Sequence, residues 1–142
     1  EFEKYKLEEN DVLIARSGTV GRIYLHGISS QKSVFASYLI RFKLDLNKVV
    51  PKFFFYYGLS PLYKNFIEKT LRTVAQPNIS AKKYCQLKIP VPPVEEQKKI
   101  VVYFDKIREI TESLKRLQQE TKEELEKLVP AILDKAFRGA LV

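Results

Sequence analysis

The side chains best suited to contact a ligand lie in an irregular polar stretch, TLRTVAQPNIS, at residues 70–80. Arginine suits guanine, while asparagine and glutamine suit adenine, so the stretch holds the residue types that read base edges and phosphates. These residues are Arg72, Thr73, Gln76 and Asn78. Ser80 can cap a short helix at residues 81–86, whose N-terminus beside Lys82 and Lys83 favours a phosphate. An ordinary surface loop has the same composition, so the stretch alone does not decide between the two interpretations.

The net positive charge of the chain lies in its first two thirds. Lys and Arg number 25 against 17 Asp and Glu, which gives a formal net charge of +8. Residues 1–93 hold 15 of the basic and 7 of the acidic residues, whereas residues 94–142 hold 10 of each. Between residues 12 and 93 only Asp45 and Glu68 are acidic. Such a field suits a polyanion, with nucleic acid the first candidate, although a basic surface also serves solubility alone.

Turns and loops of this basic part supply the other predicted contacts. Residues 17–21, SGTVG, form a predicted turn in which Gly18 and Gly21 provide positive φ or room for close backbone approach. The turn lacks the Lys-Ser/Thr ending and the glycine spacing of a nucleotide-binding loop, so it is not predicted to hold a nucleotide. By residue type and loop position, the predicted nucleic-acid contacts are Arg16, Ser17, Thr19, Arg22, Gln31, Lys32, Arg72, Thr73, Gln76, Asn78, Ser80, Lys82 and Lys83.

A catalytic or metal centre is not predicted. His26 and Cys85 are the single histidine and cysteine, so no nucleophilic set and no metal-ligand spacing is present. A metal-dependent nuclease needs clustered carboxylates, but Asp45 and Glu68 are isolated, and the acids within residues 1–11 are expected to form a solvated edge. The Asn-Pro-Pro-aromatic loop of an amino-methyltransferase is missing too. We therefore predict a non-catalytic protein without a metal or cofactor.

Membrane crossing and disulfide formation are also not predicted. No apolar run approaches the ~18 residues that cross a bilayer, and one cysteine cannot form an internal disulfide. These features fit a reducing cytoplasm, in which Cys85 is expected to be a buried structural thiol. His26 is expected to be an ordinary surface or core residue.

A small α+β domain must position the candidate contacts. Short apolar or alternating runs bounded by turn residues predict strands at residues 11–16, 22–25, 38–44 and 87–89. The third of these alternates, which predicts a half-buried strand. The residues on its inner face would be Tyr38, Ile40, Phe42 and Leu44.

Besides the short helix at residues 81–86, two helices are predicted between the third and fourth strands. One begins at Pro51 and stops at Gly58. Its run FFFYY resembles a base-stacking platform, but five successive aromatics point around the whole helix, so most are expected to be core. The second begins after the N-cap Ser60 and runs to about Leu71. Its predicted inner face comprises Leu62, Phe66, Ile67 and Leu71.

A long helix follows a proline hinge, IPVPPVEEQ, at residues 89–97. From Val94 to Lys135 it would be ~60 Å long, and its apolar residues recur at the spacings of three and four that are typical of a coiled-coil seam. Two spacings of four meet at Thr121, which is a stutter that relaxes the supercoil. The predicted helix-pairing residues are Ile100, Tyr103, Ile107, Ile110, Leu114, Leu117, Thr121, Leu125, Leu128 and Ile132.

The end of this helix carries a proline and a glycine. Pro130 is expected to kink the helix or to start a separate short helix that runs to Arg138, and Gly139 to cap its end. A domain of this size cannot bury such a rod along its length. The helix therefore needs a partner helix.

Three segments in order resemble the DNA-specificity (S) subunits of type I restriction–modification systems. They are QPNISAKKYCQLK, then IPVPPVEEQKKIV, and then a long helix that ends ILDKAFRGAL. DVLIARSGTVGR and residues 51–59 resemble the target recognition domain of that family. The combination is more specific than any one of its parts. The resemblance covers nearly the whole chain.

The resemblance implies a target recognition domain at residues 1–93 and a conserved spacer helix at residues 94–142. In the family, two such domains are joined by two antiparallel helices, and each domain reads one half of a bipartite site in double-stranded DNA. The subunit has no catalytic activity. It docks two methyltransferase subunits, to which a restriction subunit can be added.

The chain departs from this pattern in having one recognition domain, shorter than is usual, and one helix. It is therefore expected to be a fragment or a short variant, whose helix pairs with a second copy or with a missing half of the same subunit. Two alternatives stay open from the residues: the recognition domain of a fused restriction endonuclease–methyltransferase, or a coiled-coil oligomerisation protein whose basic domain binds RNA or an anionic membrane.

Overall fold

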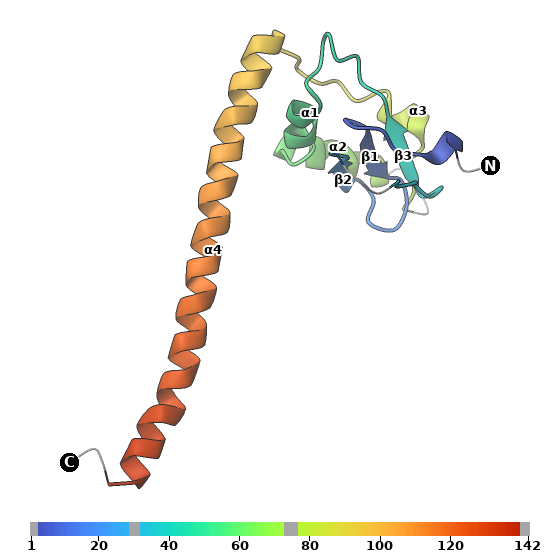
Figure 1. Ribbon diagram of the computed structural model, residues 1–142. Coiled ribbons are helices and arrows are strands. Elements are labelled where there is room, and N and C mark those ends of the chain that lie inside the picture. Colours follow the sequence, from blue (N-terminus) through green and yellow to red (C-terminus); the bar gives the residue numbers. More distant parts are fainter. Residues whose placement is uncertain (1–2, 29–31, 73–76, 140–142) are drawn as a thin grey trace. The chain divides into compact units, whose positions relative to one another are not determined.

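The computed structural model describes residues 3–28, 32–72 and 77–139 (Figure 1). In chain order its elements are η1 (Glu3–Tyr5), β1 (Val12–Ala15), β2 (Ile23–Leu25), β3 (Leu39–Phe42), α1 (Pro51–Tyr57), α2 (Pro61–Leu71), α3 (Ala81–Tyr84) and α4 (Val94–Phe137). The chain divides into two compact units, Glu1–Val102 and Tyr103–Val142. The opening turns of α4 therefore belong to the first unit.

β1 is the central strand of a three-stranded antiparallel sheet with the order β2-β1-β3. In its register Ile14 pairs with Ile23 of β2 and with Ile40 of β3. All four residues of β1 are buried, as a continuous apolar run between two neighbouring strands predicts. The first three predicted strands are thus confirmed with shorter ends.

The strand predicted at residues 87–89 is wrong, because these residues are irregular in the structure. Leu87 and Ile89 still pack against the core, which explains the apolar pattern that suggested a strand. Pro90 and the prolines at 92 and 93 lack backbone donors, so the segment cannot extend a ladder of strand hydrogen bonds. Its two inward side chains belong to a connection and not to the sheet.

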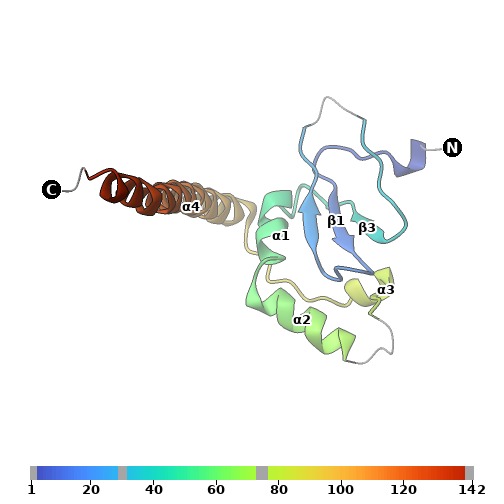
Figure 2. The same cartoon turned by 90° about the horizontal axis from the view of Figure 1, so that it is seen from below.

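Helices α1 and α2 lie along the sheet on the side away from η1 (Figure 2). The buried core combines residues of the sheet, of the three short helices and of the segment before α3: Val12, Ile14, Ile23, Phe54, Tyr57, Tyr63, Ile67, Ile79 and Tyr84. Three of the five successive aromatics of α1 are buried, so the packing interpretation is confirmed. In this way two local helices close one face of a very small sheet.

Three side chains differ from their predicted positions. Leu62 was expected to face inward but is 62% exposed, because Tyr63, at 2%, lies in phase with the buried Ile67. Tyr38 is 55% exposed, since β3 begins only at the next residue. Cys85 is exposed and not buried, because α3 is a single turn whose inward position is filled by Tyr84.

The acids near the start of the chain are not all a solvated edge. Asp11 is buried, and one of its carboxylate oxygens accepts a hydrogen bond from the Glu8 N–H at 2.8 Å and lies 3.5 Å from the guanidinium of Arg41. The same Arg41 nitrogen donates to the Lys6 carbonyl at 2.7 Å. Glu8 itself is exposed, and its hydrogen bond with Lys43 lowers the pKa of its carboxyl group. Asp11 and Arg41 thus tie the first residues to the sheet.

Gly58 follows α1 where that helix meets β2. A Cβ atom at this position would lie 2.6 Å from Cδ1 and 2.8 Å from Cγ2 of Ile23. The φ of −63° suits any residue, so alanine would add only overpacking. We expect Gly58→Ala to lower the free energy of unfolding by about 1–3 kcal/mol in a urea titration.

Gly27→Ala is the matched control, because no atom lies within 4 Å of its Cβ position. Combining Ile23→Ala with Gly58→Ala should remove the atoms that clash. This double variant should therefore lose less stability than the sum of its two single variants. Equal stability of the Gly58→Ala and Gly27→Ala proteins would contradict the packing argument.

α4 is one continuous helix of 44 residues, or ~66 Å. Of the two outcomes expected of Pro130, a separate short helix is wrong: α4 continues through Pro130 to Phe137, because the loss of one backbone donor is tolerated within a long helix. Gly139 has φ +72° and its N–H donates to the Ala136 carbonyl at 3.1 Å, as expected of a helix end. Among the helices that the structure describes, none is both long and apolar enough to span a membrane.

The surface of α4 carries charge pairs at helical spacing, as its balanced composition predicted. They are Lys98–Glu95, Arg108–Glu112, Arg116–Glu120, Lys122–Glu126 and Arg138–Asp134. Exposed pairs of this kind contribute about 0.3–0.5 kcal/mol each. They support the helix but do not replace a partner for its apolar side.

Candidate nucleic-acid interface

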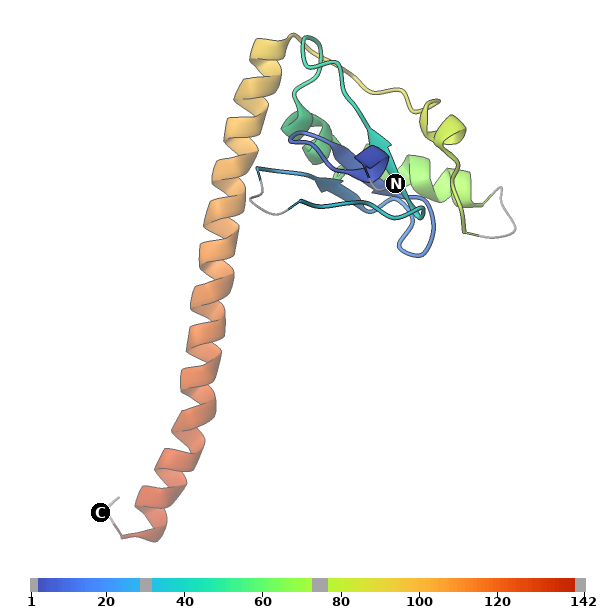
Figure 3. The ribbon, with the colours of Figure 1, turned by 45° about the vertical axis from the view of Figure 1, so that its right-hand side comes forward.

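Two of the predicted contact stretches lie side by side, at the end of β1 and before α3 (Figure 3). Ser17 forms an isolated antiparallel bridge with Asn78, and the N–H of Ile79 donates to the Arg16 carbonyl at 3.0 Å. The Nε of Arg16 donates to Oδ1 of Asn78 at 3.3 Å, across 62 positions of sequence. The fold therefore joins the turn at residues 17–21 to the end of the polar stretch that follows α2.

The turn is held by two buried tyrosine hydroxyls. Tyr63 donates to the Gly21 carbonyl at 2.9 Å, and Tyr84 donates to the Ala15 carbonyl at 3.1 Å. Burial raises the pKa of both phenols, that of Tyr84 to about 12, so both remain neutral donors at physiological pH. Ile79, fully buried next to Asn78, anchors the other strand of the bridge.

Glycine gives the turn its shape, as predicted. Gly18 and Gly21 have φ of +71° and +84°. A Cβ at Gly21 would lie 2.9 Å from Cγ1 of Ile67, so this position needs both the positive φ and the close approach to α2. The turn is therefore packed against the core and is held at both ends.

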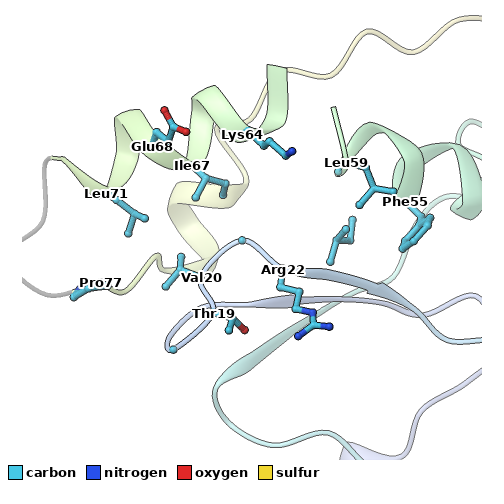
Figure 4. Close-up of a pocket in the computed structure, with 14 residues that line it drawn as sticks. Thr19, Val20, Arg22, Phe55, Leu59, Lys64, Ile67, Glu68, Leu71 and Pro77 are labelled. Atoms are coloured by element: carbon cyan, nitrogen blue, oxygen red, sulfur yellow. The ribbon is translucent and has the colours of Figure 1, made fainter. Parts of the chain in front are cut away.

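A pocket of about 660 Å³ lies between this turn, α2 and the end of α1 (Figure 4). Ile67 and Leu71 point into it from α2 toward Val20 of the turn, and Phe55 and Leu59 close its other end. Its lining is thus largely apolar. The charged residues among the lining are Arg22, Lys64 and Glu68.

The structure groups some of the predicted contacts and separates others. Arg16, Ser17, Asn78 and Ser80 come together, and Lys82 and Lys83 follow directly on α3. Thr19 and Arg22 line the pocket, while Lys32 lies in the separate loop before β3 and Arg72 directly follows α2. Gln31, Thr73 and Gln76 lie outside the described residues.

The structure confirms the predicted N-cap of α3 but shortens the predicted helix. The Ser80 hydroxyl accepts from the Lys83 N–H at 3.4 Å, so the N-cap is confirmed. However, α3 has four residues, not the six predicted, and a single turn has little dipole with which to bind an anion. Lys64, a rim residue of the pocket, was missed, although its place on the exposed side of an amphipathic helix in a basic domain could have indicated it.

The helix-pairing row of α4 is exposed from Tyr103 onward. Its apolar members are 40–64% exposed: Tyr103, Ile107, Ile110, Leu114, Leu117, Leu125, Leu128 and Ile132. Ile100, within the first unit, is partly buried. A second row near the helix end was missed, and its members are Val129, Leu133 and Phe137, at 61%, 50% and 88% exposed. Together the two rows widen the apolar face of the last turns.

Within residues 3–28, 32–72 and 77–139, no group of three or more His, Cys, Asp or Glu side chains could hold a metal ion. The chemistry that the candidate surface offers is hydrogen bonding and positive charge.

The fold and the site define a class of protein: a small α+β domain with a basic, donor-rich surface that continues into a long helix with an exposed apolar row. A sequence model of the family described as "Type I restriction modification DNA specificity domain" matches residues 1–126. The chain belongs to this family, as its sequence motifs indicated.

Individual relatives agree with this assignment. The type I restriction enzyme EcoBI specificity subunit of Escherichia coli is 25% identical over 141 residues, which cover 99% of this chain and 30% of the relative. The HsdS subunit of Thermoanaerobacter tengcongensis has a similar structure, with a TM-score of 0.63, 32% identity and coverage of 96% of this chain and 31% of that one.

A second solved structure, titled as the basis of complex assembly and conformational transition of the type I R-M system, gives a TM-score of 0.76. It is 33% identical, over 96% of this chain and 32% of that one. The predicted α+β fold, a small sheet domain followed by a long helix, is confirmed. The chain spans about a third of the length of the relatives it matches.

Proposed function

We propose that this chain is a DNA-reading part of a type I specificity subunit, in which residues 1–93 bind double-stranded DNA and read one half of a bipartite site. The observation that carries the proposal is the joining of residues 16–22 with residues 77–83 into one basic, donor-rich surface. Lys82 and Lys83 would bind phosphates, and the side chains nearer the bridge would reach base edges.

The charge distribution supports this division of labour. The whole net charge of +8 falls within residues 1–93, whereas the part from residue 94 onward is neutral. A duplex would therefore be attracted to the first unit, and α4 would act as a scaffold. With ~66 Å of length, α4 corresponds to nearly two turns of duplex at ~34 Å each.

DNA binding should weaken steeply with salt. Binding of the full chain to a duplex is to be followed by fluorescence anisotropy, after selection of a preferred sequence from randomised duplexes. Log affinity is expected to fall linearly with log salt, at a slope of about −0.9 for each phosphate neutralised. Lys82→Glu with Lys83→Glu should make this slope shallower by about two such steps.

Lys115→Glu with Lys127→Glu on α4 is the matched control, since it changes the net charge equally and should leave DNA affinity nearly unchanged. The selected duplex should also bind more tightly than a scrambled one of the same length. Equal affinity for the two at every salt concentration would refute sequence reading.

We further propose that α4 pairs antiparallel with a partner helix, which for this chain alone is a second copy. In a longer subunit the partner would be a second spacer helix. The wide apolar face near Phe137 supports contact with more than one helix, and methyltransferase subunits, with a restriction subunit bound through them, are the proposed partners. Co-purification of a methyltransferase subunit in stoichiometric complex tests this part of the proposal.

A further inference from the structure

Arg16 is held from three directions. Its N–H donates to the Tyr38 carbonyl at 2.9 Å, its own carbonyl accepts from the Ile79 N–H at 3.0 Å, and its Nε donates to Asn78. A free arginine side chain loses rotamer entropy when it binds a ligand. Fixing the backbone on both sides and the guanidinium at Nε removes part of that loss before any ligand arrives.

The partner of Arg16 is an amide and not a carboxylate. Among residues 3–28, 32–72 and 77–139, no acidic side chain forms an ion pair with Arg16, so its positive charge is not neutralised within the described part of the chain. Arg16 is half-buried and Asn78 is exposed. The guanidinium is therefore positioned and still charged.

The pair offers hydrogen-bond donors to a ligand. Nε can only donate, so Asn78 presents its oxygen to Arg16, and its Nδ2 group is a donor that this bond does not use. The two Nη groups of Arg16 add further donors. Adenine reading by asparagine uses the amide oxygen as an acceptor, but one of the two lone pairs of that oxygen is engaged by Arg16, which holds the oxygen toward the guanidinium. The role first predicted for Asn78, a direct adenine contact, is therefore disfavoured by this geometry.

We propose that Asn78 is a positioning residue for Arg16, and that the pair binds an acceptor-only edge of duplex DNA. Two sources have this chemistry: two oxygens of one backbone phosphate, or O6 and N7 of one guanine. This inference rests on the proposed function, because it requires that the domain binds DNA.

The test compares Asn78→Ala in two backgrounds, the natural chain and an Arg16→Lys chain, using the selected and scrambled duplexes. Lysine keeps the charge but has no Nε for Asn78 to orient. We expect Asn78→Ala to weaken binding about 5- to 10-fold in the natural chain and less than about 2-fold in the Arg16→Lys chain, because Asn78 acts through the guanidinium. Asn65→Ala, an exposed asparagine on α2, is the matched control.

Arg16→Ala identifies the source of the acceptors. A loss of affinity for both duplexes, with a slope of log affinity against log salt that is shallower by about 0.9, assigns a phosphate. A loss of affinity for the selected duplex alone assigns a guanine. A urea titration of each variant separates these losses from unfolding. Equal effects of Asn78→Ala in both backgrounds, or no effect in the natural chain, would overturn the inference while leaving DNA binding intact. Absence of duplex binding by the natural chain would overturn the proposed function itself.

Discussion

Replacing Gln97 with leucine is expected to lower the free energy of unfolding of the first unit by about 3–5 kcal/mol. Gln97 is fully buried in the first turn of α4. Its Oε1 accepts from the Val50 N–H at 2.8 Å, and its Nε2 donates to the Lys48 carbonyl at 2.8 Å and the Pro92 carbonyl at 2.7 Å. Leucine has a similar size, so the substitution removes these bonds without leaving a large cavity.

The expected loss comes from the backbone groups that remain behind. One N–H and two carbonyls would lose the partner that Gln97 gives them, and a buried polar group without a partner costs about 1–3 kcal/mol. The extra apolar surface of leucine offsets part of this. The measurement is a urea titration followed by tyrosine fluorescence, since Tyr57, Tyr63 and Tyr84 are buried in the same unit.

Gln118→Leu is the matched control, because it makes the same exchange at an exposed position of the same helix. It should leave the unfolding midpoint almost unchanged. If both glutamine variants unfolded at the same urea concentration, the three bonds of Gln97 would not stabilise the unit.

Changing Leu114 and Leu117 to lysine together is expected to weaken self-association of the chain by at least ~100-fold. Both residues belong to the exposed apolar row of α4, at 54% and 53% exposure. Pairing would bury each leucine, and burial of one such side chain contributes about 1.5–3 kcal/mol. Four leucines would be removed from a symmetric pair, and lysine charges would be added on both helices.

Sedimentation velocity over a concentration series measures this effect, and far-ultraviolet circular dichroism checks that the helix persists. Glu112→Lys with Gln119→Lys is the control, since these positions lie on the opposite side of α4 from the row. It should retain the association of the natural chain. A sedimentation coefficient that the leucine substitutions leave unchanged would refute pairing through this row.

Local signals predicted much of the fold. Pro51 and Gly58 mark the two ends of α1, and Ser60 with Pro61 marks the start of α2, so these two helices have the predicted starts. The strand at residues 87–89 was wrong because pairing depends on a neighbouring strand, which a short apolar pattern does not reveal. Of the outcomes expected at Pro130, the separate helix does not form, since the residues around the proline favour the helix strongly enough to continue it.

The candidate site was predictable by residue type but not by arrangement. Arg16 and Asn78 were both selected for their side chains, yet nothing in their spacing indicates that they touch. Asp11 was assigned to a solvated edge because its partner, Arg41, lies thirty positions later in β3. No role was predicted for Gln97, because two of its three partners, the Lys48 carbonyl and the Val50 N–H, are backbone groups of a distant loop.

The bonds of Gln97 also bear on how such a protein can be divided for engineering. A recognition module cut at the prolines would lose the glutamine that ties Lys48, Val50 and Pro92 together, although every strand and short helix would remain. A junction after Val102, where the first unit ends within continuous helix, would keep these three bonds inside the module. A chimaera joined there keeps the three hydrogen bonds of its own Gln97. The helical register then has to match between donor and recipient.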